Sequence, residues 1–198
     1  MKGRIRVFTN VAAQSRLSGK TRLLSLALFT TVFVCNSAVA SARQAAKPAN
    51  WEAWQFLLGE WEGKGGGAPG QGAGGFTFAL DLQKRILVRR NHSDYPATDK
   101  QPAFSHEDLM VIYQETDKPA RAIYFDNEGH VIHYNVEFSP DQNAIVFLSE
   151  ASPSAPQFRL TYNKAPQNSL AIKFEIAPPG TPGKFSTYLQ AVVQKKER

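Results

Sequence analysis

The sequence predicts an all-β protein, an antiparallel up-and-down barrel of about eight to ten strands preceded by one short helix. Beyond Gly59 the apolar residues recur with a period of two, and turn-forming residues interrupt this pattern every eight to twelve positions. Short turns between consecutive strands favour antiparallel neighbours. A sheet of this many strands is best closed into a barrel, because closure removes the edges that would pair with other chains.

Residues 1–42 are expected to be a secretory signal peptide. Positions 1–22 carry six basic residues and no acidic one, the apolar run 23–35 follows, and small residues at 38–42 offer a cleavage site. The apolar run is shorter than the roughly 20 residues that a membrane-spanning helix needs. The mature protein is therefore expected in the periplasm or the medium, with no membrane span after cleavage.

Removal of this segment changes what charge and cysteine content imply. The whole chain has a formal net charge of +6, but 17 basic and 17 acidic residues remain after residue 42. A neutral mature chain argues against nucleic acid as a partner, because such a surface needs clustered positive charge. Cys35 is the only cysteine and leaves with the signal peptide, which excludes disulfides, thiolate metal sites and cysteine nucleophiles.

Residues 43–50 form a polar tether, and residues 51–198 form the barrel domain. Within this domain Trp51, Trp54 and Leu57 have helical spacing, with Asn50 as the N-cap and Gly59 as the terminator. Pro is confined to the loops between the expected strands, as strand pairing requires. The expected strands are 75–82, 85–92, 107–114, a hairpin over 120–138 with its turn at 127–129, 144–150, 157–163 and 170–176, followed by 185–193 as a last strand or a short helix.

The segment 59–75 has nine glycines in seventeen positions and matches G-x-G-x-x-G twice. That motif binds phosphate only where a helix N-terminus follows it. Here the expected strand 75–82 follows, and the Walker-type spacing is also absent. The stretch is therefore not interpreted as a nucleotide site.

Gly59-x-Trp61 at the end of a short helix, entering a first strand, resembles the calycin superfamily, which includes lipocalins, fatty-acid-binding proteins and nitrobindin. The continuation to Gly63 and Gly65 is most similar to nitrobindin-like and other lipocalin-like bacterial proteins, and "YFDNEGHVIHY" resembles a run in uncharacterised exported bacterial proteins. The resemblance implies that Trp61 plugs one barrel end against the helix. Gly63 would then allow strong strand coiling, and 66–75 would be a loop at the barrel mouth.

No metal or cofactor is expected. Nitrobindin-like barrels hold haem through a histidine late in the chain, whereas this chain has no histidine after His133. His130 and His133 lie three positions apart on an expected strand and so face opposite sides, which prevents them from sharing a metal ion there.

The ligand-binding residues expected from residue type and strand parity are Arg90, His92 and Tyr113, with His133 in reserve. Arg89 and Arg90 must face opposite sides of the sheet, so one of them can point into the barrel and bind an anion. These residues would anchor a small apolar or amphiphilic molecule, because barrels of this size have room for one such ligand.

Two other functions stay open at this point. The first is a hydrolase or isomerase that uses the histidines and acidic residues at one barrel mouth, where Asp126 and His130 flank a turn and His106 precedes Glu107 and Asp108. No recognisable catalytic triad motif accompanies them. The second is a structural envelope protein whose barrel is filled by its own side chains, and the 13 Phe residues favour this interpretation.

Overall fold

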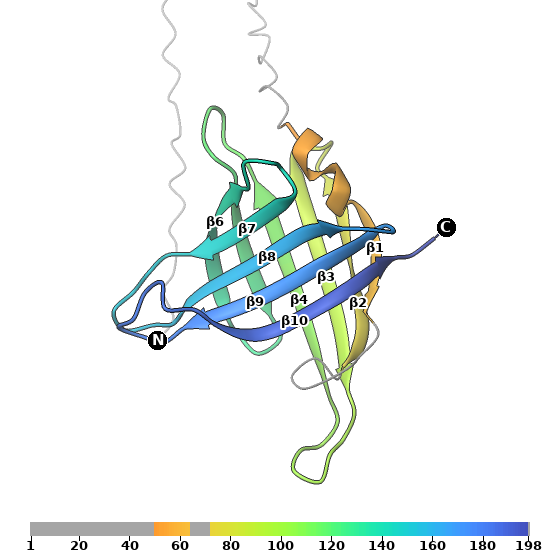
Figure 1. Ribbon diagram of the computed structural model, residues 1–198, viewed down its shortest axis with the longest axis vertical. Coiled ribbons are helices and arrows are strands. Elements are labelled where there is room, and N and C mark those ends of the chain that lie inside the picture. Colours follow the sequence, from red (N-terminus) through yellow and green to blue (C-terminus); the bar gives the residue numbers. More distant parts are fainter. Residues whose placement is uncertain (1–49, 64–71, 198) are drawn as a thin grey trace, which may run out of the picture. The chain divides into compact units, whose positions relative to one another are not determined.

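The computed structural model describes residues 50–63 and 72–197, which form a short helix and a closed antiparallel barrel of ten strands (Figure 1). The predicted fold class is confirmed. Each strand pairs with its neighbours in sequence, and β1 pairs with β10 to close the barrel. The strands are β1 (Gly59–Gly63), β2 (Ala73–Asp81), β3 (Ile86–Tyr95), β4 (Phe104–Tyr113), β5 (Arg121–Asp126), β6 (Val131–Phe138), β7 (Ala144–Ser149), β8 (Gln157–Ala165), β9 (Ser169–Ala177) and β10 (Ser186–Lys195).

Several boundaries differ from the sequence-based expectation, and β3 and β4 extend three residues beyond the expected ends of 85–92 and 107–114 toward their common connection. The last element is the strand β10 and not a helix, with a register shift between Thr187 and Leu189. Strand β2 begins at Ala73, so 73–75 belong to the sheet and not to a loop. The expected signal peptide, the tether up to residue 49 and loop positions 66–71 lie outside the described residues.

Gly74 and Gly75 are required by the close approach of β2 to its two neighbours. A Cβ atom on Gly74 would lie 2.1 Å from the carbonyl oxygen of His92, and one on Gly75 would lie 2.3 Å from that of Trp61. Any other residue at these two positions would therefore push the strands apart.

The helix η1 (Glu52–Leu57) is a 3₁₀ helix that covers one end of the barrel. Asn50 accepts a hydrogen bond from the backbone N–H of Glu52 at 3.0 Å, and the indole of Trp51 donates to the carbonyl of Lys84 in the β2–β3 turn at 2.7 Å. Trp54 packs edge-on against Phe138 of β6 and Phe147 of β7. The strands alternate in direction, so the β2–β3, β4–β5, β6–β7 and β8–β9 connections lie at this end (Figure 1).

Trp61 on β1 ties the barrel wall to η1. Its indole Nε1 donates to the carbonyl of Leu57 at 2.7 Å, its ring stacks on Phe76 of β2, and the Lys195 ammonium lies 5.4 Å from the ring centroid. Gly59, which links η1 to β1, has φ +123°, a conformation that favours glycine. Gly63 lies on β1 opposite Val193 of β10.

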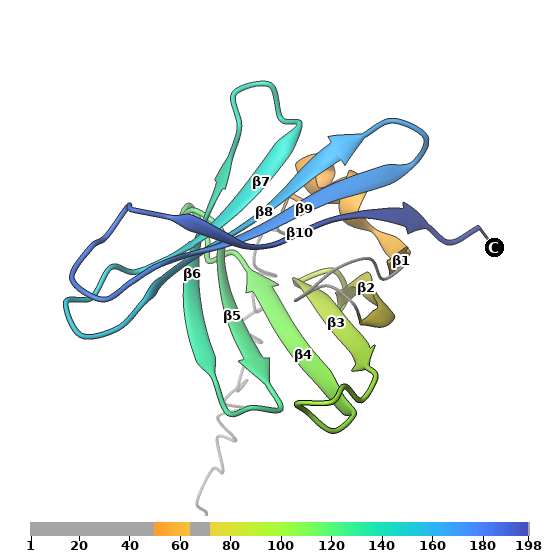
Figure 2. The ribbon, with the colours of Figure 1, turned by 60° about the horizontal axis from the view of Figure 1, so that its bottom comes forward.

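Burial divides the barrel interior into two halves. Near η1 the inward side chains are shielded from solvent, and the fully buried ones include Leu57, Phe78, Leu87, Ile112, Phe147 and Tyr162. Toward the other end, inward side chains such as Asn91, Tyr124, Ile132 and Phe174 are half-buried. We call these the sealed half and the mouth half. The mouth half ends at the β3–β4, β5–β6, β7–β8 and β9–β10 connections, where Figure 2 shows β3 to β6 curving along one side and β8 to β10 crossing the other.

Within the described part of the chain, no helix has the length and apolarity to cross a membrane.

Candidate functional site

Arg89 stands at the boundary between the two halves. It shares the inward face of β3 with Leu87, and only 9% of its surface is exposed. Its guanidinium carbon lies 5.1 Å from the ring centroid of Phe76, and its Nη1 donates to Oδ1 of Asp108 on the neighbouring strand β4. Burial of a guanidinium without a counter-charge is costly, so the carboxylate of Asp108 stabilises Arg89 at this buried position.

The ion pair continues toward the mouth through His106, two residues before Asp108 on the same face of β4. Its Nε2 lies 3.5 Å from Oδ2 of Asp108 and 3.1 Å from the hydroxyl of Tyr124, and its Nδ1 lies 2.9 Å from Oε1 of Glu128. The hydrogen bond to Asp108, with further help from Glu128, raises the pKa of His106 to about 9 against the opposing effect of burial. The imidazole is therefore mainly protonated at neutral pH, and both its N–H groups are already engaged.

Two buried polar atoms beside this network lack hydrogen-bond partners. They are Nε of Arg89 and the hydroxyl of Tyr162 on β8. Both side chains lie against Phe76, whose ring centroid is 5.9 Å from that of Tyr162. Burial raises the pKa of Tyr162 to about 12, so the hydroxyl keeps its proton. A buried donor without a partner costs about 1–3 kcal/mol, which marks this spot as unusual for a barrel core.

The mouth half is polar on one side and apolar on the other. On β3, Asn91 and Ser93 face inward beyond Arg89, are half-buried, and have no side-chain hydrogen bond to another described residue. On β8, β9 and β10 the inward side chains are apolar, with Phe158 and Phe174 stacked in parallel at 5.9 Å. The further inward apolar side chains of this half are Ile132, Ile176, Leu189 and Ala191.

Aromatic rings line the rim of the mouth half. Tyr95 and Phe104, directly opposed across β3 and β4, stack with centroids 4.6 Å apart. Tyr188, in the irregular part of β10, meets Phe174 edge-on and is 54% exposed. Burial, and to a smaller extent the charges of Tyr188 and Glu128, raises the pKa of Tyr95. Exposed aromatic surface at the end of a barrel suits contact with an apolar molecule.

The structure places all four sequence-predicted ligand residues on the outward face of the barrel. Arg90 is the outward neighbour of Arg89, and His133 is the outward neighbour of the buried Tyr134. Tyr113 follows the buried Ile112 on β4, so its side chain lies on the opposite, outward face. The inward arginine is thus Arg89 and not Arg90, and the two candidates Tyr113 and His133 are not brought together with it.

The fourth candidate, His92, belongs to an exposed polar cluster on the outward face of β3 and β4. Its ring nitrogens lie 3.0 Å from Asp94 and 3.3 Å from Glu107, and Asp94 raises its pKa most. Ser105 donates to Asp94 and not to His92. The serine is therefore not activated by the histidine, as a nucleophilic triad would require.

His130 and Asp126 form a separate pair at the β5–β6 turn. Asp126 accepts hydrogen bonds from the backbone N–H groups of Glu128 and His130, and its Oδ2 lies 2.8 Å from Nδ1 of His130. This carboxylate organises the turn. Among the residues that the structure describes, no group of three or more histidines, cysteines and acidic residues is arranged to hold a metal ion.

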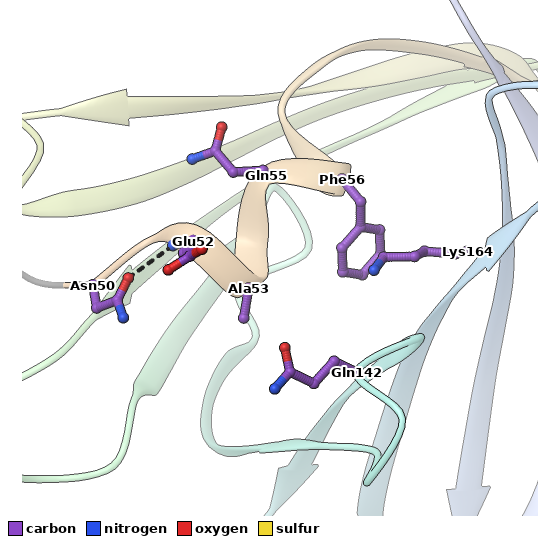
Figure 3. A pocket seen from close by; sticks show the side chains of 7 residues that line it. All are labelled: Asn50, Glu52, Ala53, Gln55, Phe56, Gln142 and Lys164. Carbon is purple, nitrogen blue, oxygen red and sulfur yellow. Dashed lines mark hydrogen bonds between the residues drawn. The ribbon is translucent and has the colours of Figure 1, made fainter.

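A shallow pocket of about 430 Å³ lies outside the barrel against η1 (Figure 3). Lys164 of β8 covers one side of it, with its ammonium 4.8 Å from the ring centroid of Phe56. The pocket is wide open and has no buried polar group without a partner, so it is a weaker candidate than the mouth half. It is lined by Asn50, Glu52, Ala53, Gln55, Phe56, Gln142 and Lys164.

Residue type and strand parity in the sequence favour Arg90 over Arg89 and do not distinguish Asn91 or Tyr162 from their neighbours. A signal for Tyr162 was present, since Leu160 and Tyr162 alternate with the polar Arg159, Thr161 and Asn163. Comparison with protein-family models and with curated proteins gave no match to this chain.

Proposed function

We propose that the protein is an exported binder of a small amphiphilic molecule, which it holds in the mouth half of the barrel. The observation that carries this proposal is the division of the interior at Arg89. The sealed half is filled with side chains, whereas the mouth half presents half-buried aromatic rings opposite Asn91 and Ser93, whose side chains bond to no other described residue. Such a pairing of apolar walls with a few polar groups is typical of small-molecule sites.

Binding is a better account of this site than acid–base catalysis. A general base must be unprotonated near neutral pH, whereas the hydrogen bonds of His106 to Asp108 and Glu128 raise its pKa to about 9. Both ring nitrogens are also occupied by neighbours within the protein. The histidine therefore stabilises the polar side of the barrel and is not free to accept a proton from a substrate.

The test is a titration with N-phenyl-1-naphthylamine, a neutral apolar dye that fluoresces on leaving water. We expect saturable binding with one site per chain. Asn91→Phe, which fills space on the inward face of β3, should weaken it at least tenfold. Gln190→Phe on the outward face of β10 adds the same ring and should leave the affinity within twofold.

Three outcomes distinguish the alternatives. Absence of dye binding to the folded protein contradicts the proposal and favours a barrel filled by its own side chains. A loss of affinity in Gln190→Phe but not in Asn91→Phe contradicts the inward site. A loss of affinity in Arg90→Ala/His92→Ala would show that these two residues bind the ligand, as the sequence suggested, but on the outward face of the barrel and not inside it.

The family and the location belong to the same proposal. A ten-stranded antiparallel barrel with a short helix at one end is compatible with a calycin-like fold. The basic and apolar residues of 1–42 favour export. Mass spectrometry of the protein recovered from the periplasm or the medium should find a chain that begins near residue 41 or 43. Recovery of the full-length chain would contradict cleavage.

A further inference from the structure

We infer that the ligand is uncharged and that a hydrogen-bond-accepting oxygen of it is held by Nε–H of Arg89 and the hydroxyl of Tyr162. This inference rests on the proposed function and names the chemical class of the ligand. Its two supports are the charge balance of the mouth half and the two buried atoms without partners.

Among the described side chains that face inward in the mouth half, both cations are already paired with carboxylates. Arg89 is paired with Asp108, and His106 lies between Asp108 and Glu128. Asp126, opposite Asp108 in the register, adds a third carboxylate. An anionic head group would therefore find no unpaired cation among these inward side chains. A buried charge without a counter-charge is strongly disfavoured.

A cationic ligand is disfavoured for a different reason. The carboxylate of Asp108 is bonded to Arg89 and lies near His106, and that of Asp126 accepts two backbone N–H groups and the ring of His130. A cation entering the mouth half would compete with bonds that already exist. What the inner end of the site lacks is an acceptor.

An uncharged acceptor oxygen supplies what these atoms lack. The arginine Nε–H is a donor only and the protonated tyrosine hydroxyl donates readily. Both side chains lie against Phe76, so we expect a single carbonyl or ether oxygen bound there to accept from both. Neither atom is exposed to solvent, so the ligand has to displace part of a neighbouring ring to reach them. The apolar remainder of the ligand then lies along Phe158 and Phe174.

The test compares three probes of equal chain length, 2-decanone, decanoate and decylammonium, by displacement of the dye at pH 7. We expect 2-decanone to bind most tightly. Tyr162→Phe removes one hydroxyl and should weaken 2-decanone binding about threefold to tenfold, the worth of one hydrogen bond. The affinity for the dye, which has no oxygen, should stay within twofold. Arg89→Lys keeps the charge beside Asp108 but removes Nε–H, and should have the same selective effect.

The control is Thr161→Val, which removes a hydroxyl from the outward neighbour of Tyr162 and should change neither affinity. Tighter binding of decanoate or decylammonium than of 2-decanone overturns the inference. So does an unchanged 2-decanone affinity in both Tyr162→Phe and Arg89→Lys. If the dye also fails to bind to the wild-type protein, the proposed function itself fails, and this result is distinct from the other two.

Discussion

Asp108→Asn should destabilise the barrel more than any other substitution of an acidic residue by its amide. The change keeps the shape of the side chain but leaves Arg89, which is only 9% exposed, without its counter-charge. Breaking a buried ion pair from one side costs about 3–5 kcal/mol, a large part of the 5–15 kcal/mol that a domain of this size has. At about 2–4 °C per kcal/mol, the melting temperature should fall by about 6–20 °C.

Urea unfolding followed by tryptophan fluorescence measures this loss, because Trp51, Trp54 and Trp61 are all buried near η1. Asp99→Asn in the exposed β3–β4 loop is the matched control and should change the free energy of unfolding by less than about 0.5 kcal/mol. A loss below about 1 kcal/mol in Asp108→Asn would show that the arginine is not held as a buried charge, and the reasoning about the site would fail.

Three further predictions concern stability. Arg159 and a neighbouring lysine lower the pKa of Glu175 to about 2 against the effect of burial. This carboxylate should therefore stabilise the fold above about pH 4.5, by about 1–2 kcal/mol after solvent screening. That contribution should vanish as pH falls toward 2, and Glu175→Gln should flatten the acid limb of the unfolding curve. The His106 ring should titrate near pH 9 when followed by NMR. Its contribution to the free energy of unfolding should be complete below about pH 6.5 and should be lost as the pH rises through 9. Titration near pH 6.5 would contradict its bonds to the carboxylates. Gly74→Ala should lower the free energy of unfolding by more than about 3 kcal/mol, because the new Cβ would collide with a backbone oxygen. Gly180→Ala, at φ +73° with open space around it, should lower it by about 1–2 kcal/mol. Equal losses would contradict the close approach of β2 and β3.

The sequence was sufficient for the fold because the signals of strands and turns are local. Alternating side chains and turn residues mark nearly every strand, including the β5–β6 hairpin around residues 127–129. The start of β2 was missed because Gly74 and Gly75 have no side chains and so cannot show alternation. Only the neighbouring strands, with their carbonyl oxygens close to both positions, reveal why glycine is needed there.

The residues of β3 alone do not decide which of its side chains face the barrel interior. Ile86, Leu87 and Val88 are consecutive apolar residues, and Val88 on the outward face is nearly as buried as Leu87 on the inward face. Either Arg89 or Arg90 therefore fitted the interior equally well. The cross-strand pairing of Arg89 with the fully buried Met110 decides the question, and that pairing is a property of the assembled sheet.

Stability alone is a poor explanation for an ion pair at the centre of this barrel. Replacing both members of a buried pair with apolar residues is often neutral or stabilising, because the desolvation of two charges offsets their attraction. Arg89→Met/Asp108→Leu should therefore recover most of the stability that Asp108→Asn loses. If this double variant is as stable as the wild type yet no longer distinguishes 2-decanone from the dye, the pair is present for the ligand. If it retains that distinction, the unpartnered Nε of Arg89 is a by-product of packing, and the oxygen-binding role falls to Tyr162 or to neither residue.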